Sequence, residues 1–141
     1  MNKIIRLTKL ENDRLWRLAS DVALYAYSEL DNFGEEEMYG MQQKLRDRAF
    51  DLTNDIAEAV GAVDPRDKTH YYGHALGAAY SVRNTLLMAN KTEMLNVEPI
   101  VFVKLDQLTE ALHGEVMETS DDIPEFLKKF TTQDSNQDKK S

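Results

Sequence analysis

The stretch EEEMYGMQQKLRDRAFDLTNDIAEAVG, residues 35–61, carries apolar side chains at intervals of three or four residues. This spacing marks one face of an α-helix, which turns about once every 3.6 residues. Glu35–Glu37 would place carboxylates in the first turn, where they suit the helix dipole, and Gly61 suits the helix end. The stretch therefore predicts an amphipathic helix. Its apolar stripe is Met38, Met41, Leu45, Ala49, Leu52, Ile56, Ala59 and Val60.

Three further stretches show the same periodicity: residues 10–30, a stretch that opens at residue 64, and one that starts near residue 96. Asp64 is a good N-cap, and Pro65 suits the first helical position. Asn96 is the predicted cap of the last helix, with Pro99 tolerated in its first turn. The three stripes are Leu15, Leu18, Val22, Tyr25 and Leu30; Tyr72, Ala75, Ala79, Val82, Leu86 and Ala89; and Val101, Leu105, Leu108, Leu112 and Val116.

The stretch that opens at residue 64 is rich in small residues. Gly73 and Gly77 each cost up to about 1 kcal/mol of helix propensity relative to alanine. We expect the close approach of a neighbouring helix to compensate for that cost.

Four helical stretches joined by short connections predict an all-α, antiparallel up-down four-helix bundle. No strand-like alternation of apolar and polar residues competes with this interpretation. We expect a basic N-terminal extension (1–9), a bundle domain (10–119), a short C-terminal helical turn (120–130) and a disordered polar tail (131–141).

The composition excludes several classes of function. The chain of 141 residues has no cysteine, which rules out disulfides, thiolate metal sites and cysteine nucleophiles. Its longest apolar run, 99–103, is far short of the about 20 residues that span a bilayer. We find no secretory signal, P-loop, dinucleotide fingerprint or Gly-x-Ser-x-Gly motif. We therefore expect a cytoplasmic protein that is not an enzyme, with no cofactor and no membrane partner.

The net charge of −8 makes the surface repel phosphate backbones. Contact with RNA or DNA would therefore require a local basic patch, and the candidate residues are Arg14, Arg17, Lys44, Arg46 and Arg48. Asp47 and Asp51 are interleaved with these bases, and Asp51 can pair with Arg48 three residues away. We favour a surface of ordinary ion pairs over a basic strip, and we keep the strip as the alternative.

Two patterns resemble half of a di-metal site in a helical bundle: Asp67-x-x-His70 and Glu110-x-x-His113. His70 and His74, four residues apart, could also hold a stray metal ion. The histidines lie off the apolar stripes, and the other helices offer no clear bridging carboxylates. We interpret them as solvated histidines and assign no metal site.

Residues 36–61 also carry a resemblance. The residues Tyr39, Gly40, Leu45, Arg46, Ala49, Ile56, Ala57, Glu58 and Gly61 fit one motif in a single register without a gap. Trp16 and the pair Ala75-x-Gly77 fit further elements of the same pattern. The motif resembles that of the four-helix-bundle family of intervening-sequence proteins, encoded inside large ribosomal RNA genes. The likeness covers about residues 10–118.

The resemblance implies a ring-forming homo-oligomer, commonly a homopentamer. A related branch comprises the accessory variability proteins of diversity-generating retroelements, which bind a reverse transcriptase and its template RNA through a basic surface. Lys44, Asp47, Asp51 and Asp55 stand where the family has Gln, Arg, Ser and Asn. These departures weaken direct RNA binding and leave the fold untouched.

We therefore expect a non-catalytic, homo-oligomeric scaffold or accessory factor for a reverse transcriptase or another RNA-processing partner. The alternative is a direct RNA- or DNA-binding protein that uses the local basic patch. Aromatic residues on the first and third helices could serve a subunit interface or the packing of a single subunit, and the sequence does not separate the two: Trp16, Tyr25, Tyr27, Tyr71, Tyr72 and Tyr80.

Overall fold

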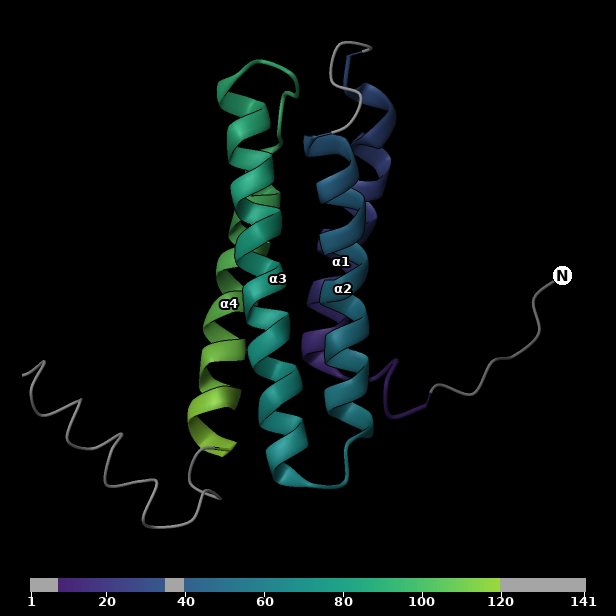
Figure 1. The fold of residues 1–141 in the computed structure, drawn as a ribbon, viewed down its shortest axis with the longest axis vertical. Coiled ribbons are helices and arrows are strands. Elements are labelled where there is room, and N and C mark those ends of the chain that lie inside the picture. Colours follow the sequence, from purple (N-terminus) through teal and green to yellow (C-terminus); the bar gives the residue numbers. More distant parts are fainter. Residues whose placement is uncertain (1–7, 35–39, 120–141) are drawn as a thin grey trace, which may run out of the picture.

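The computed structural model describes residues 8–34 and 40–119. Its elements are α1 (Arg14–Glu29), the 3₁₀ turn η1 (Leu30–Asn32), α2 (Met41–Gly61), α3 (Pro65–Lys91) and α4 (Pro99–Thr119), which lie side by side (Figure 1). These ranges contain helices and no strand, so the predicted all-α class is confirmed. Within them, no helix combines the length and the apolar character needed to cross a membrane. The predicted C-terminal turn (120–130) and polar tail (131–141) lie outside the described residues.

Two helix starts follow the capping chemistry of the sequence. The Asp64 side chain accepts a hydrogen bond from the backbone N–H of Arg66 at 2.9 Å, and Pro65 is the first residue of α3, as predicted. Asp13 caps α1 in the same way by accepting from Trp16 N at 2.9 Å. The first helix therefore begins at Arg14 rather than at Leu10, because the chain before Asp13 forms turns.

Two other predicted starts are wrong. α2 begins at Met41, after Gly40, so Glu35–Glu37 do not form its first turn, and residues 35–39 lie outside the described residues. α4 begins at Pro99, so Asn96 is too far upstream to be its N-cap. Val97, which follows Asn96, is bound to the end of α3: the Asn90 side-chain oxygen accepts a hydrogen bond from Val97 N at 3.0 Å.

The predicted apolar stripes form the core. Burying each of the larger side chains contributes roughly 1.5–3 kcal/mol, so mutual burial of the four stripes dominates the stability of the fold. Leu18, Tyr25, Met41 and Val60 pack against the core while partly exposed. The largest fully buried side chains are Leu45, Leu52, Ile56, Leu86, Leu105, Leu108, Leu112, Val22, Val82 and Val101.

Each helix packs mainly against two others: α1 and α3 each lie against both α2 and α4. Polar contacts join the same neighbours. The Tyr25 hydroxyl of α1 accepts from Glu98 N, just before α4, at 2.9 Å. Lys104 of α4 reaches Asp21 of α1 at 3.2 Å. The first and last helices are therefore held together at successive levels.

The expected close packing at the glycines of α3 is not found among residues 8–34 and 40–119. A Cβ atom added at Gly73 or Gly77 would meet no atom within 4 Å, and both residues are exposed. The small-residue side of α3 therefore faces outward, so no helix among the described residues makes the expected close approach, and close packing against another copy stays a prediction.

α3 ends in a cap with a left-handed residue, although no glycine marks this position in the sequence. Glu93 adopts a φ of 63°, the only positive φ outside glycine among the described residues. Glu93 N donates to Asn90 O at 3.1 Å, and Met94 N donates to Ala89 O at 2.9 Å. This pair of bonds is the Schellman motif, in which glycine usually occupies the left-handed position. Glutamate there pays a steric cost because its Cβ approaches the backbone.

We expect Glu93→Gly to stabilise the fold. Removing the Cβ should relieve about 1 kcal/mol of strain, partly offset by the greater freedom of glycine in the unfolded chain. Urea unfolding followed by circular dichroism measures the change. Glu93→Ala is the matched control, because it removes the charge and keeps the Cβ. Equal stability changes in both variants would contradict the strain argument.

Candidate interaction surfaces

Two hollows follow one another along the seam between α2 and α3, and together we call them the α2–α3 groove. One end has a more apolar lining, contributed by Met41 and Met88. The other end has a floor of small residues, with His70 and His74 beside it. Both ends are open to solvent. The lining residues are Gly40, Met41, Gln43, Lys44, Asp47, Asn84, Thr85 and Met88 at the first end, and Arg48, Thr69, His70, Gly73, His74, Gly77, Ala78 and Ser81 at the second.

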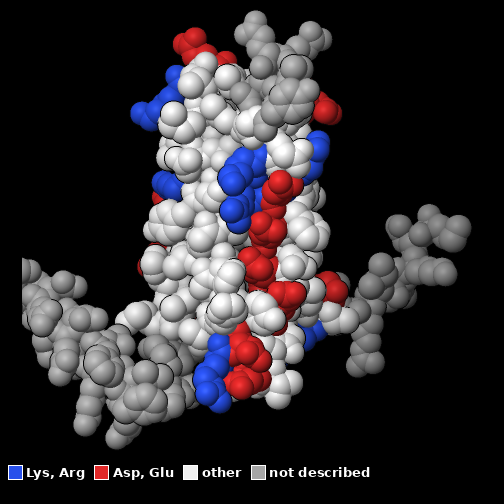
Figure 2. Space-filling view, viewed as in Figure 1, with Lys and Arg blue, Asp and Glu red and all other residues white. Residues whose placement is uncertain are grey.

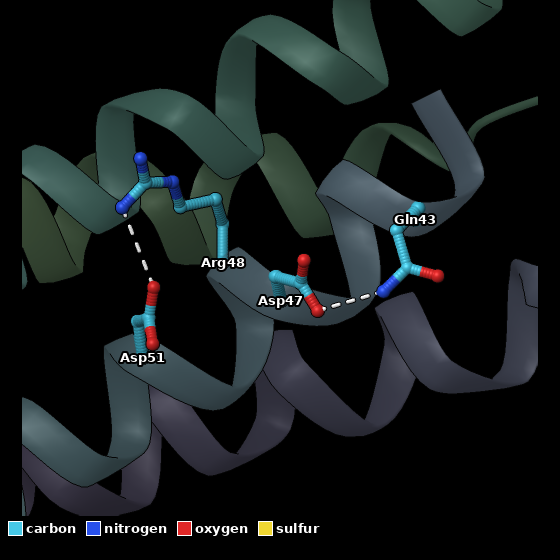
Figure 3. Close-up of polar contacts among 4 residues, drawn as sticks. All are labelled: Gln43, Asp47, Arg48 and Asp51. Atoms are coloured by element: carbon cyan, nitrogen blue, oxygen red, sulfur yellow. Dashed lines mark hydrogen bonds and ion pairs between the residues drawn. The ribbon is translucent and has the colours of Figure 1, made fainter. Parts of the chain in front are cut away.

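Some charged side chains of α2 beside this groove already have hydrogen-bond partners on the same helix (Figure 3). The Gln43 side-chain amide donates to Asp47 at 2.9 Å. Arg48 donates to Asp51 at 3.3 Å, which is the ion pair predicted from their spacing. Both partners are more than two-fifths exposed, so the pair contributes little stability. It does reduce the positive charge that Arg48 offers to another molecule.

Acidic side chains form a column on α2. Asp47, Asp51 and Asp55 are spaced four residues apart and Glu58 follows, so all four lie on one side of the helix. Figure 2 shows Asp and Glu gathered in a column down the middle of the face that α2 and α3 share, with the basic side chains in separate groups. This face is therefore not a continuous basic surface.

Asp55 lies in the middle of that column and is partly buried. Burial raises the pKa of its carboxyl group, and the nearby Asp51 and Glu58 carboxylates raise the pKa further. His74 on α3 and Arg48 act in the opposite direction and lower the pKa of Asp55. Burial and the neighbouring carboxylates therefore disfavour the charged form of the Asp55 carboxyl group.

Apolar side chains are exposed on the α1–α2 side of the bundle. Leu24, Tyr27 and Phe50, which we call the α1–α2 patch, have exposed fractions of 63%, 37% and 59%. Tyr27 and Phe50 line one hollow together with Arg46, and Leu24 lies one turn before Tyr27 on α1. Partial burial of the Tyr27 hydroxyl raises its pKa, and the charge of Asp51 adds to that effect.

A second exposed apolar set lies on the α3–α4 side. Tyr80, Leu87 and Val103, which we call the α3–α4 patch, are all exposed. Arg83, between the two α3 members, bonds to Asp106 at 2.7 Å and lies 5.6 Å from the centre of the Phe102 ring. Because α1 pairs with α2, and α3 pairs with α4, the two patches occupy opposite sides of the bundle.

The five candidate bases do not form one strip. Arg14 and Arg17 begin α1, whereas Lys44 and Arg46 lie near the start of α2, beside the end of α1. The length of α1 separates the two groups by about 20 Å. On α2 the bases also diverge, because Lys44 and Arg48 line the two ends of the α2–α3 groove while Arg46 lines the α1–α2 hollow.

Partners differ among these bases. Arg17 donates to the Glu11 carbonyl oxygen at 2.7 Å and to Asn12 Oδ1 at 3.1 Å. The side chains of Arg14, Lys44 and Arg46 are exposed and make neither a hydrogen bond nor an ion pair with any residue in 8–34 or 40–119. These three are the bases that remain available for an anionic partner.

The two carboxylate-x-x-His pairs lie at different levels. The His113 ring packs edge-on against Tyr80, with centroids 6.3 Å apart. His70 precedes Tyr80 by ten residues on α3, which is about 15 Å along the axis. Within the described ranges, no three His, Asp or Glu side chains gather as a metal site would require. The two pairs therefore do not combine, and both histidines are exposed.

The family-motif residues fall into two groups. Leu45 and Ile56 are fully buried, and Ala57 is half-buried. The others are surface positions or mark helix boundaries: Gly40 precedes α2, Gly61 ends it, and Arg46, Glu58 and Gly77 are exposed. Tyr39 lies outside the described residues. The motif therefore combines core packing with surface positions that the fold alone does not require.

Sequence reasoning missed Leu24 and Phe50. Both are large apolar residues at positions outside the helical stripes, and that mismatch with the periodicity is the signal that could have found them. It also missed the contacts of Arg83 with Asp106 and Phe102, because they join helices far apart in sequence.

We expect Asp55→Asn to stabilise the protein at pH 7. The pKa of Asp55 is higher in the folded than in the unfolded protein, so protonation of Asp55 stabilises the fold. This stabilisation is complete below the ordinary carboxyl pKa and is lost as the pH rises through the folded-state pKa. The amide mimics the protonated form, so its advantage should shrink towards about pH 3.5. Thermal unfolding of both proteins across this range measures the difference.

Asp106→Asn is the control with the opposite sign, since it removes the partner of Arg83 and should destabilise the protein. An Asp55→Asn variant that is less stable than the parent at pH 7 would refute this account of the Asp55 carboxyl group.

The family model described as 23S rRNA-intervening sequence protein matches residues 11–114. No curated protein shows a significant sequence match to this chain. The matched range spans α1, α2, α3 and most of α4, and the four-helix architecture agrees with the resemblance carried by residues 36–61. Since the match covers well over half of the 141 residues, the chain belongs to the 23S rRNA-intervening sequence protein family.

Proposed function

We propose that this protein is a non-catalytic, cytoplasmic, homo-oligomeric scaffold or accessory factor for an RNA-processing partner, with a reverse transcriptase as one candidate. In this proposal the four helices form an antiparallel up-down bundle, and copies of the bundle join into a ring. The family assignment supports an RNA-associated role. The accessory role and the relation to diversity-generating retroelements come from the resemblance.

The observation that carries the oligomer is the pair of apolar patches on opposite sides of the bundle. Leu24 and Phe50 leave more than half of their surface in water, and so does Tyr80. When two different surfaces of the same molecule meet, the contact is head-to-tail, and repetition gives a ring if the rotation closes. Contact of the α1–α2 patch of one copy with the α3–α4 patch of the next would remove both patches from water.

The second candidate function is direct RNA binding. The specific observation in its favour is that Arg14, Lys44 and Arg46 are exposed and unpaired within the part of the chain that the structure describes. One chain presents them as separated groups and not as a strip. Repetition around a ring would bring several copies of Lys44 and Arg46 onto one particle, which would strengthen weak single contacts through multivalency.

We expect light scattering at tens of micromolar protein to give a mass that is a multiple of 16.2 kDa. Phe50→Glu should shift that mass towards the monomer, because it places a charge in the apolar contact. Val63→Glu is the matched control: Val63 is 97% exposed and belongs to neither patch, so this variant should keep the parent mass. A strictly monomeric parent protein would refute the homo-oligomer.

We expect any RNA affinity to fall steeply with salt and to depend on Lys44 and Arg46. If both bases contact phosphates of single-stranded RNA, Lys44→Ala with Arg46→Ala should reduce the slope of log K against log salt by about 1.4. Electrophoretic mobility shifts with structured and single-stranded RNA measure the slope. Arg66→Ala is the control, because Arg66 is associated with Asp64 at 3.8 Å. Absence of any shift at low salt would reject direct binding and leave the scaffold intact.

A further inference from the structure

His70 and His74 form a pair of imidazoles on the outer surface of α3. They are four residues apart, so they project from the same side of the helix. Their ring centroids are 4.4 Å apart and their planes are inclined at 58°. Both side chains are exposed. Nothing in the packing of the bundle requires this pair, because the core is built from the apolar stripes.

The separation of the two rings matches what a shared metal ion requires. An imidazole nitrogen binds Zn²⁺ at about 2.1 Å, and two such ligands subtend about 90–110° at the metal. With the ring centre about 1.15 Å beyond the nitrogen, this geometry places the two centroids about 4.6–5.3 Å apart. Histidines at positions i and i+4 of one helix are an established metal-binding arrangement. Small rotations of exposed rings would bring His70 and His74 from 4.4 Å into that range.

The surroundings of the pair are open and negatively charged. Gly73 and Gly77 lie beside it without side chains, and a Cβ added to either would meet no atom within 4 Å. The remaining coordination positions of a metal ion would therefore face solvent. Asp55 on α2 is close enough to His74 for their charges to interact. Of the bases in this hollow, Arg48 is already paired with Asp51 at 3.3 Å.

We propose that His70 and His74 together bind a divalent transition metal ion of the imidazole-preferring class, such as Ni²⁺, Cu²⁺ or Zn²⁺. The two imidazoles supply nitrogen ligands, and water fills the other positions. The acidic column of α2 attracts the cation without ligating it. The site is independent of the scaffold role and of RNA binding. It differs from the carboxylate-x-x-His pattern, whose two halves lie at different levels of the bundle.

Isothermal titration of the untagged full chain with NiCl₂ tests this site. We expect saturable binding of one Ni²⁺ per one or two chains, with tighter binding of Cu²⁺. His70→Ala and His74→Ala should each weaken Ni²⁺ binding at least about tenfold, because a single imidazole loses the advantage of two ligands held together. His113→Ala, which removes the exposed histidine of α4, should leave binding unchanged.

A second measurement separates nitrogen ligation from simple attraction to the acidic column. Excess Mg²⁺ or Ca²⁺, which prefer oxygen ligands, should not displace Ni²⁺ from a two-imidazole site. The proposal is overturned if no binding occurs at 100 µM Ni²⁺, if the His70 and His74 variants bind like the parent, or if Mg²⁺ displaces the ion. Folding is not at risk, since alanine is the better helix former at these exposed positions.

Discussion

Mutual burial of four apolar stripes is the constraint on which the rest of the molecule depends. Each stripe recurs once per helical turn, and no helix can remove its stripe from water alone. Leu52 of α2, Leu86 of α3 and Leu108 of α4 are fully buried only because the other helices cover them. The polar contacts that join different helices, such as Arg83 with Asp106, lie at the edges of this core. They set how far one helix is shifted along its neighbour, and they contribute little to the free energy of unfolding.

Because stability comes mainly from the buried stripes, the exposed positions of α2 are free to vary. Positions facing the core must stay apolar, whereas Asp47, Asp51, Asp55 and Glu58 are tolerated because water reaches them. The fold accepts the repulsion among these carboxylates because the penalty for exposed like charges is small compared with the burial of a leucine. The fold can therefore carry an acidic face on α2 without disturbing its core.

The core was predictable and the surfaces were not. Periodicity identified the ten largest fully buried side chains, since burial and spacing have one physical cause, but it missed small buried residues such as Ala19, Ala23 and Ala26. Helix boundaries were predictable where a side chain caps the backbone, as at Asp64, and were wrong where no such cap exists, as at Met41. Gly73 and Gly77 indicate that one side of α3 is flat, but composition does not say which helix, if any, covers that side. Whether Lys44 and Arg46 share a surface depends on how α2 is rotated against its neighbours, which spacing along one helix does not determine.

The hydrogen bond from Glu98 N to the Tyr25 hydroxyl and the ion pair of Lys104 with Asp21 carry a consequence for synthesis. The partner of α1 on this side is α4, which is the last of the described helices to be synthesised. Until α4 emerges, the side of α1 that it will cover is exposed to solvent, and the first three helices form an incomplete core. The core is therefore completed only after α4 has emerged, and until then the nascent chain is exposed to chaperones and to neighbouring copies on the same message.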